Sequence, residues 1–202
     1  MTTLPLPTAT CPPAAAPPPA NYPGDLAMWV FILAELLVFG VFFLAYAVAR
    51  QAHLAEFTTY QRTLDARFGV FNTVALLTGG YAAAQAVAAI RQDRTRVATY
   101  WLLGVCGAGL GFCAVKSVEL SAKFAEGVSL STHLFYMFYL GLSIFHLMHV
   151  VLGMVIMGFV TVKTARGGYT ATNHAGMETG ASYWHMVDLV WVVLFPLLYL
   201  VR

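Results

Sequence analysis

Charged residues are scarce in this chain. Lys, Arg, Asp and Glu make up 10% of its 202 residues, whereas soluble domains usually contain about 25%. The formal net charge of +2 is small and the basic residues form no run, so nucleic acid is not an expected partner. With 59% hydrophobic residues and a mean hydropathy of +0.72, the composition indicates an integral membrane protein.

Cysteine is also rare, and its spacing favours neither a disulfide scaffold nor a zinc site. The three cysteines are Cys11, Cys106 and Cys113, and they form no C-x-x-C pair. Cys106 and Cys113 fall on one face of a predicted helix, where we interpret them as small packing residues. No apolar signal region precedes Cys11, so we expect no lipoprotein anchor there.

Proline is nearly confined to the first part of the chain. Residues 1–24 contain eight of the nine prolines and no Lys or Arg. Such a segment cannot form a regular helix, so we expect a disordered, polyproline-like tail and no signal peptide. Residues 25–202 are then expected to form one transmembrane domain.

Five apolar segments are each long enough to cross a bilayer as a helix, which takes about 20 residues. We expect these helices at about 26–49, 69–90, 97–120, 132–162 and 181–200. Pro196 should kink the last of them. The predicted fold is therefore an all-α bundle of five transmembrane helices.

Small and aromatic residues indicate where these helices meet each other and the membrane surface. Glycines allow close packing of membrane helices, and we expect contacts at Gly79, Gly80, Gly107, Gly111, Gly153 and Gly158. An interfacial aromatic belt is predicted at the start of the fourth helix, from Phe135, Tyr136, Phe138 and Tyr139.

The connectors divide their basic residues evenly between the two sides of the membrane. The densest cluster is Arg91, Arg94 and Arg96, in the short connector after the second helix. Short loops weigh most in the positive-inside rule, so this cluster favours an inside N-terminus and an outside C-terminus.

One carboxyl group, that of Glu35, lies near the middle of the first predicted helix. Its neighbours are apolar and offer no countercharge. It therefore needs a partner from another helix, bound water or a proton. Two interpretations stay open: a buried carboxyl bonded to a histidine or hydroxyl, and a protonatable group in a proton path or lipid site.

Two more helices carry polar pairs at helical spacing. His146 and His149 share one face of the fourth helix, and His185 and Asp188 share one face of the fifth. These side chains are competent metal ligands, but they also bond between membrane helices. Because no Glu-x-x-His spacing supports a di-iron bundle, we expect no metal. A metal-dependent enzyme using His146, His149 and His185 is the minor alternative.

Lys116 and Glu119 are three residues apart near the end of the third helix. We expect an ion pair within that helix whose side chains reach the membrane interface. The alternative is a contact with a lipid headgroup or a partner subunit.

Four motifs follow one another across residues 25–202. They are Ala34-Glu35-x-x-x-Phe39-Gly40-x-Phe42-Phe43, Asn72-Thr73, His146-x-x-His149-Val150-x-x-Gly153 and Tyr183-Trp184-His185-x-Val187-Asp188-x-Val190-Trp191. Together they resemble subunit III of the haem-copper oxidases, in the short five-helix form that lacks the first two helices of longer members.

Three stretches resemble the NorE type, which is encoded beside nitric oxide reductase. They are Lys116-x-x-Glu119, Tyr183-Trp184-His185-Met186-Val187-Asp188 and Leu194-Phe195-Pro196-Leu197-Leu198-Tyr199. One stretch departs from the family. Leu44-Ala45-Tyr46-Ala47-Val48 stands where longer members have Trp-Ala-Phe-Tyr-His, so contacts made by that run are not carried over.

The resemblance implies a subunit without a catalytic centre or redox cofactor of its own, in a bacterial inner membrane. Its partner would be a catalytic subunit with haem and copper or iron, either oxidase subunit I or the nitric oxide reductase large subunit. The implied roles are assembly, stability, phospholipid binding, and proton or gas access. The implied polar interior is Glu35, His146, His149, His185 and Asp188. The residues alone leave one alternative, a small proton channel or transporter in which Glu35 titrates.

Overall fold

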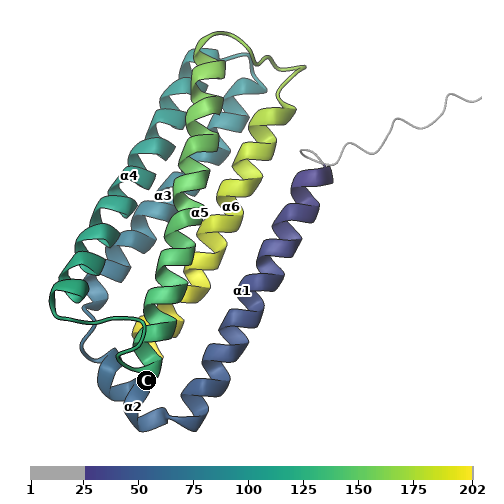
Figure 1. Cartoon of the computed structure of the whole chain (residues 1–202). Coiled ribbons are helices and arrows are strands. Elements are labelled where there is room, and N and C mark those ends of the chain that lie inside the picture. The colour runs from purple at the N-terminus through teal and green to yellow at the C-terminus, as the bar shows by residue number, and fades with distance from the viewer. Residues whose placement is uncertain (1–25, 202) are drawn as a thin grey trace, which may run out of the picture.

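The computed structural model describes residues 26–201, and within them it contains helices and no β-strand. Its long helices are α1 (Leu26–Ala52), α3 (Ala66–Ile90), α4 (Thr95–Ala125), α5 (Leu134–Ala165) and α6 (Ala175–Phe195), the last continued by a π-helical turn, η1 (Pro196–Leu200) (Figure 1). All five are long and apolar enough to span a membrane, which confirms the predicted fold for this part of the chain. The predicted tail, residues 1–24, lies outside the described residues.

Two local features differ from the expected boundaries. A short helix, α2 (Leu54–Gln61), joins α1 to α3 and buries the side chain of Phe57. In addition, α6 begins at Ala175, ahead of the apolar stretch. Its polar first turn is held by an ion pair of 2.6 Å between Glu178 and Arg91 at the end of α3. Hydropathy alone misses such turns because they lie outside the hydrocarbon.

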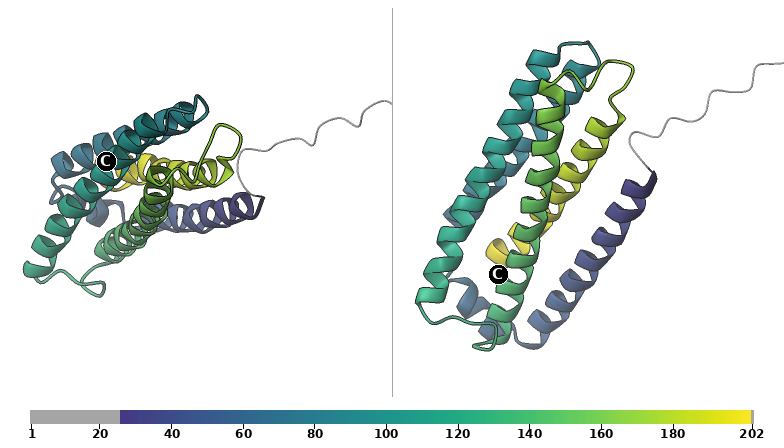
Figure 2. Two further views of the ribbon diagram at one scale, coloured as in Figure 1. Left: turned by 90° about the horizontal axis from the view of Figure 1, so that it is seen from above. Right: turned by 45° about the horizontal axis from the view of Figure 1, so that its top comes forward.

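Helix α6 is the central element of the bundle and α1 is peripheral. In the most apolar stretch of α6, 61% of the residues are buried, against 11% in α1. Helix α6 packs against α1, α3 and α5, while α4 packs against α3 and α5. Both further views keep α1 at the edge of the bundle, next to α6 (Figure 2). The residues of α6 as a whole therefore face other helices more than those of α1 do.

The indole ring of Trp184 on α6 lies where three helices contribute a glycine. A Cβ added at Gly79 of α3, Gly109 of α4 or Gly153 of α5 would come within 3.3 Å of this ring. With hydrogen in place of a methyl group, all three helices pack closely around one large side chain. This contact fixes the position of α6 inside the bundle.

The G-x-x-x-G motif of α4 does not make the contact that we expected. A Cβ added at Gly107 or Gly111 would have no atom of another residue within 4 Å, apart from the backbone of its own helix and its chain neighbours. The same holds for Gly158 of α5. Gly109, which lies between the two glycines of the motif, makes the close contact instead. The prediction was wrong because the motif identifies a face of α4 but not the direction in which that face points.

A residue in the left-handed conformation follows each of three helices and turns the chain into a short connector. Gly127 and Gly167 follow α4 and α5 with φ of +80° and +74°, the left-handed conformation of a glycine that closes a helix. Asp93 adopts the same conformation after α3, with φ of 56°. Its Oδ1 accepts a hydrogen bond of 2.7 Å from the amide of Ala171, which ties the α3–α4 connector to the α5–α6 connector.

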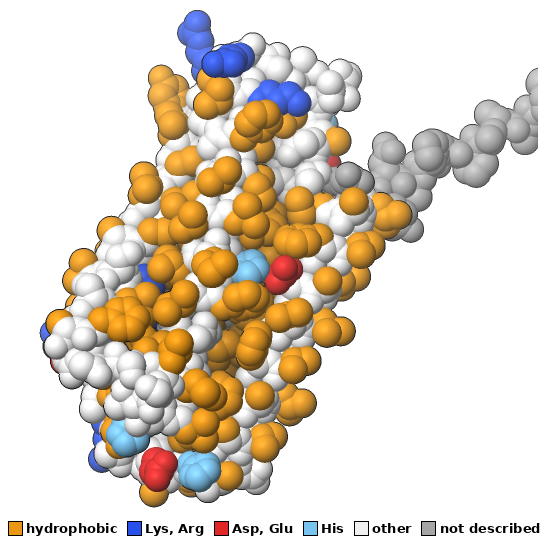
Figure 3. Space-filling view, in the orientation of Figure 1, with side chains coloured by type: hydrophobic (Ala, Val, Ile, Leu, Met, Phe, Trp, Pro, Cys, Tyr) orange, Lys and Arg blue, Asp and Glu red, His pale blue; other side chains and the backbone are white. Residues whose placement is uncertain are grey.

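The outer surface is mainly hydrophobic along the length of the helices. Leu37, Tyr100 and Phe159 are among its large exposed side chains. On the face seen in Figure 3, most charged side chains gather toward the two ends, while one acidic and one histidine side chain lie together at mid-height. This distribution suits a protein surrounded by lipid, in which charge inside the hydrocarbon is costly.

Candidate functional site

Glu35 on α1 and His149 on α5 are joined across the two helices. The Oε2 atom of Glu35 lies 3.0 Å from Nε2 of His149. The other ring nitrogen, Nδ1, lies 2.7 Å from the carbonyl oxygen of Phe145, one turn earlier in α5. A carbonyl oxygen only accepts hydrogen bonds, so this contact assigns a proton to Nδ1.

This assignment restricts the protonation of the pair. If the ring is neutral, Nε2 is an acceptor and the Glu35 carboxyl must carry the proton of the bond. If Nε2 is also protonated, the ring is a cation that faces a carboxylate. In both cases Glu35 and His149 share one proton and have no net charge together. The pair thereby avoids the cost of an isolated charge in the membrane.

The surroundings of this pair are aromatic and close to the lipid-facing surface. The side chains of Glu35 and His149 are 20% and 10% exposed. The ring of His149 lies 5.3 Å from that of Phe39 and 4.7 Å from that of Phe145. Tyr183 of α6 donates a hydrogen bond of 3.2 Å to the backbone carbonyl of His149. The pair therefore joins α1 to the part of α5 that α6 also holds.

His185 and Asp188 form a second pair within α6. Nδ1 of His185 lies 3.3 Å from Oδ2 of Asp188, and the two side chains are 47% and 11% exposed. A Cβ added at Gly80 of α3 would collide with the same Asp188 oxygen. A glycine at position 80 is thus what allows the carboxylate to lie between α3 and α6.

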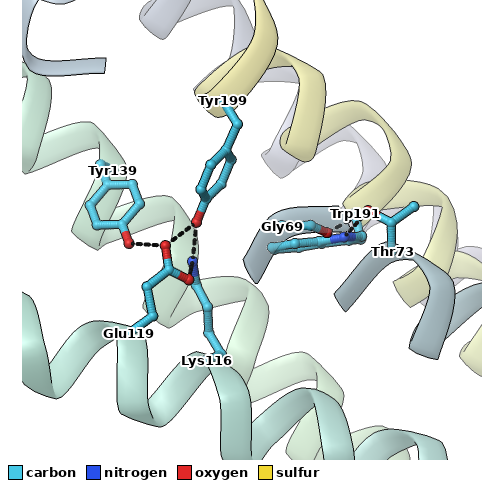
Figure 4. Close-up of polar contacts among 7 residues, drawn as sticks. All are labelled: Gly69, Thr73, Lys116, Glu119, Tyr139, Trp191 and Tyr199. Carbon is cyan, nitrogen blue, oxygen red and sulfur yellow. Dashed lines mark hydrogen bonds and ion pairs between the residues drawn. The ribbon is translucent and has the colours of Figure 1, made fainter. Parts of the chain in front are cut away.

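Lys116 and Glu119 form a buried cluster with two tyrosines (Figure 4). Nζ of Lys116 donates to Oε2 of Glu119 at 3.0 Å and to Oη of Tyr199 at 2.7 Å. The Tyr139 hydroxyl donates to Oε1 of Glu119 at 2.8 Å, and the Tyr199 hydroxyl donates to the same oxygen. The cluster joins α4, α5 and η1.

The ion pair was expected at this position, but its expected place at the membrane interface was wrong. Lys116 is 0% exposed and Glu119 is 5% exposed. Both turn inward because the tyrosine hydroxyls satisfy them there, and because Nζ also lies 5.0 Å and 5.5 Å from the ring centres of Tyr139 and Trp191. Such cation–π contacts strengthen where water is excluded.

Two residues of this cluster were missed from the sequence. We expected Tyr139 in an interfacial aromatic belt, together with Phe135 and Tyr136, but all three are buried. Tyr199 lies after Pro196 in the terminal motif and was given no role. A signal was present, because a buried tyrosine hydroxyl needs a hydrogen-bond partner. The Lys116–Glu119 pair was the charged group that could have been assigned to these hydroxyls.

His146 differs from His149 although the two share a helix face. It is fully buried, and neither of its ring nitrogens has a hydrogen-bond partner among the described residues. Its ring stacks on Trp191 with 5.3 Å between centres and meets Phe112 edge-on at 5.6 Å. Only one of the two predicted histidines therefore takes part in a polar pair.

The predicted histidines do not converge on one point. Within residues 26–201, no group of three or more His, Cys, Asp or Glu side chains is close enough to hold a metal ion. The Asn72-Thr73 motif instead contributes to packing, because Trp191 Nε1 donates to Thr73 Oγ1 at 3.0 Å. Of the site residues predicted from the sequence, all but His146 thus bond to another polar side chain of the described residues.

The fold and these pairs define a helical membrane protein, with five spans within residues 26–201. Residues 24–201 match the family model described as cytochrome c oxidase subunit III. The chain belongs to this family, which confirms the resemblance seen in the motifs.

Three similar proteins are consistent with this assignment. Cytochrome c oxidase subunit 3 of Synechocystis sp. is 31% identical over 180 residues, covering 87% of this chain and 76% of that protein. The probable quinol oxidase subunit 3 of Staphylococcus aureus is 26% identical over 178 residues, covering 87% and 88%. The "Heme-copper oxidase subunit I+III" of Aeropyrum pernix is 29% identical over 181 residues, and the chain covers only 22% of that longer protein.

Proposed function

We propose that this chain is a non-catalytic subunit of a haem-copper respiratory complex in a bacterial inner membrane. The observation that carries the proposal is that its membrane-embedded polar groups engage each other in pairs: Glu35 with His149, His185 with Asp188, and Lys116 with Glu119. Membership of the subunit III family supports it. So does the relative whose name joins subunits I and III in one protein.

The first role that we propose is to provide a rigid surface for the catalytic subunit. Helices in lipid gain no hydrophobic free energy by associating, so packing and polar bonds must hold them. The Glu35–His149 bond fixes the peripheral helix α1, and the Lys116 cluster fixes the end of α6. Loss of either contact should lower the amount of assembled complex more than it lowers the redox activity of the complex that does assemble.

The second proposed role is to hold a phospholipid. An apolar hollow of about 360 Å³ lies between α1 and α5, and Phe42, Met137 and Phe145 contribute to its wall. A hollow of this size and lining suits part of an acyl chain. Phe145 also contacts the His149 ring, so a lipid bound here would be separated from the Glu35–His149 pair by this side chain. The shared proton of that pair supports a role in proton access.

The finer assignment concerns the catalytic partner and the orientation. The Lys116-x-x-Glu119 motif and the terminal Pro196 motif support the NorE type, whose partner would be the large subunit of nitric oxide reductase. The relative whose name joins subunits I and III favours subunit I of an oxidase as the partner. The cluster of Arg91, Arg94 and Arg96 supports an inside N-terminus.

The test is capture of the tagged chain from its native membrane in mild detergent. We expect haem absorption bands and a catalytic subunit identified by mass spectrometry, whose haem type distinguishes oxygen from nitric oxide chemistry. A colourless chain without a partner would overturn the proposal. If such a chain conducted protons in liposomes, and Glu35→Gln abolished this flux, the channel alternative would replace it.

A further inference from the structure

We infer that the uncovered side of α6, between α1 and α3, receives a transmembrane helix of the catalytic subunit. The inference rests on the proposed function, because it assigns the surface through which that partner binds. Other helices cover most of α6. The side that they leave uncovered is therefore a narrow strip on the element that anchors the bundle.

This strip has the spacing of a helix-packing seam. It consists of Ser182, which is partly exposed, and His185, Leu189 and Val192, which are exposed. Successive members are three, four and three residues apart, as in the seam of two helices that pack side by side. One further helix could follow this strip along most of α6.

Shallow grooves flank the strip on both sides. One of about 280 Å³ lies between α3 and α6, and its wall includes Ala84 and Ala88. Another of about 280 Å³ lies between α1 and α6, and its wall includes Ile32. Ser182 and His185 contribute to both grooves. Side chains of a docked helix could fill them, and the alanines permit a close approach.

The chemistry of His185 favours a protein helix over lipid. His185 lies ten residues after Ala175, or about 15 Å along α6, and its side chain is 47% exposed. The pair carries no net charge in two forms: a protonated Asp188 that donates to Nδ1, or an imidazolium that faces a carboxylate. In both forms Nε2 of His185 bears a proton and is a hydrogen-bond donor. Nε2 has no partner among the described residues. Acyl chains offer no acceptor, so the occupant should present a hydroxyl, amide carbonyl or carboxylate oxygen opposite His185.

The membrane-surface end of the α3–α6 groove is polar. The ion pair between Arg91 and Glu178 lies there, with the Arg91 side chain 57% exposed. Specific interfaces commonly combine an apolar centre with a polar rim. The whole surface therefore offers a polar rim at the headgroup level and one hydrogen-bond donor, Nε2 of His185, near mid-membrane.

The test is photocrosslinking in the native membrane. A photoreactive phenylalanine analogue replaces Ala88 or Leu189 within the proposed surface, one position at a time. Val155 on α5 and Leu110 on α4, whose side chains are 65% and 62% exposed, serve as matched controls. We expect adducts with the catalytic subunit from Ala88 and Leu189 and few from the controls.

Three results would overturn the inference while the proposed function stands. They are catalytic-subunit adducts from the control positions only, adducts with lipid only, and no adduct although the catalytic subunit is captured with the chain. If the unmodified chain captures no catalytic subunit, the proposed function itself fails. Capture by the unmodified chain thus separates the two failures.

A second measurement tests the assigned partner chemistry. His185→Gln keeps an N–H donor near the position of Nε2, whereas His185→Leu removes it. Since one interhelical hydrogen bond in a membrane contributes modestly, we expect His185→Leu to lower recovery of the catalytic subunit about threefold and His185→Gln to lower it less. Equal recovery with both variants would contradict the assignment. Equal amounts of folded chain, measured by size-exclusion chromatography, are the control for folding.

Discussion

Tyr199 reaches Lys116 across the bundle, with 2.7 Å between its Oη atom and Nζ of the lysine. The π-helical turn that begins at Pro196 makes this contact possible. Proline has no N–H for the α-helical bond, and the chain closes a wider turn in which the amide of Val201 donates to the carbonyl of Pro196 at 2.9 Å. The wider turn directs Tyr199 into the core, and the kink expected at Pro196 stays a prediction.

The buried ion pair should be sensitive to loss of one partner. Lys116→Met leaves Glu119 buried without a countercharge, and we expect a loss of about 3–5 kcal/mol in the free energy of unfolding. Replacing both residues, as in Lys116→Met with Glu119→Leu, removes both charges and should restore part of that loss. Circular dichroism of the purified protein during thermal unfolding in detergent measures both effects.

Lys123 provides the control on the same helix. It also has a glutamate partner three residues away, at 2.8 Å, but the side chain of Glu126 is 57% exposed. Because exposed ion pairs contribute little, Lys123→Met should cost less than about 1 kcal/mol. Equal losses from Lys116→Met and Lys123→Met would show that burial of the pair is unimportant.

The Glu35–His149 bond should appear as a coupling free energy. We expect a coupling free energy of about 1 kcal/mol from the double-mutant cycle that combines Glu35→Leu with His149→Leu, because interhelical hydrogen bonds in membranes contribute near this value. Glu35→Gln should retain much of the stability because an amide can still bond to the ring. The same cycle with His146→Leu should give no coupling, and a coupling as large as that of His149 would contradict the assigned pairing.

Two glycines of α4 should respond differently to an added methyl group. A Cβ at Gly109 would lie 2.8 Å from Met154 and from the ring of Trp184, so Gly109→Ala should cost about 1–3 kcal/mol through overpacking. Gly107 has open space, and Gly107→Ala should be neutral or slightly stabilising because alanine favours the helix. The two thermal unfolding curves decide this, and a larger loss at Gly107 would refute the packing around Trp184.

Asp188 should be more tolerant of asparagine than of leucine. Asparagine keeps an oxygen near Nδ1 of His185, which is 3.3 Å from the present carboxylate, and it fits beside Gly80 with nearly the same volume. Leucine leaves the imidazole without its partner inside the membrane. We expect more assembled complex from Asp188→Asn than from Asp188→Leu, measured by capture of the catalytic subunit. Equal assembly would argue against a structural role for this pair.

The sequence was sufficient to predict the number of membrane helices. Length and hydropathy decide whether a segment spans, and these depend on local composition. The cost of an isolated carboxyl in lipid also predicted the kind of partner for Glu35. The choice of His149 over His146 was not predictable, because helical spacing places both on one face and only the rotation of α5 against α1 separates them.

The errors share this cause. The position of Gly109 and the inward direction of Lys116 depend on how α4 is rotated against its neighbours, which a helical period does not specify. Tyr199 depends in addition on a local change of helix type after Pro196. Contacts that cross the bundle therefore require the structure, whereas a contact within one helix, such as the ion pair of Lys116 with Glu119, follows from spacing.

The most direct test of the account is native mass spectrometry of the complex captured through a tag on this chain. The account predicts that the 22.0 kDa chain is bound in stoichiometric amount to a haem-containing catalytic subunit. A chain found alone, or only with further copies of itself, would contradict the assignment as a subunit of a respiratory complex.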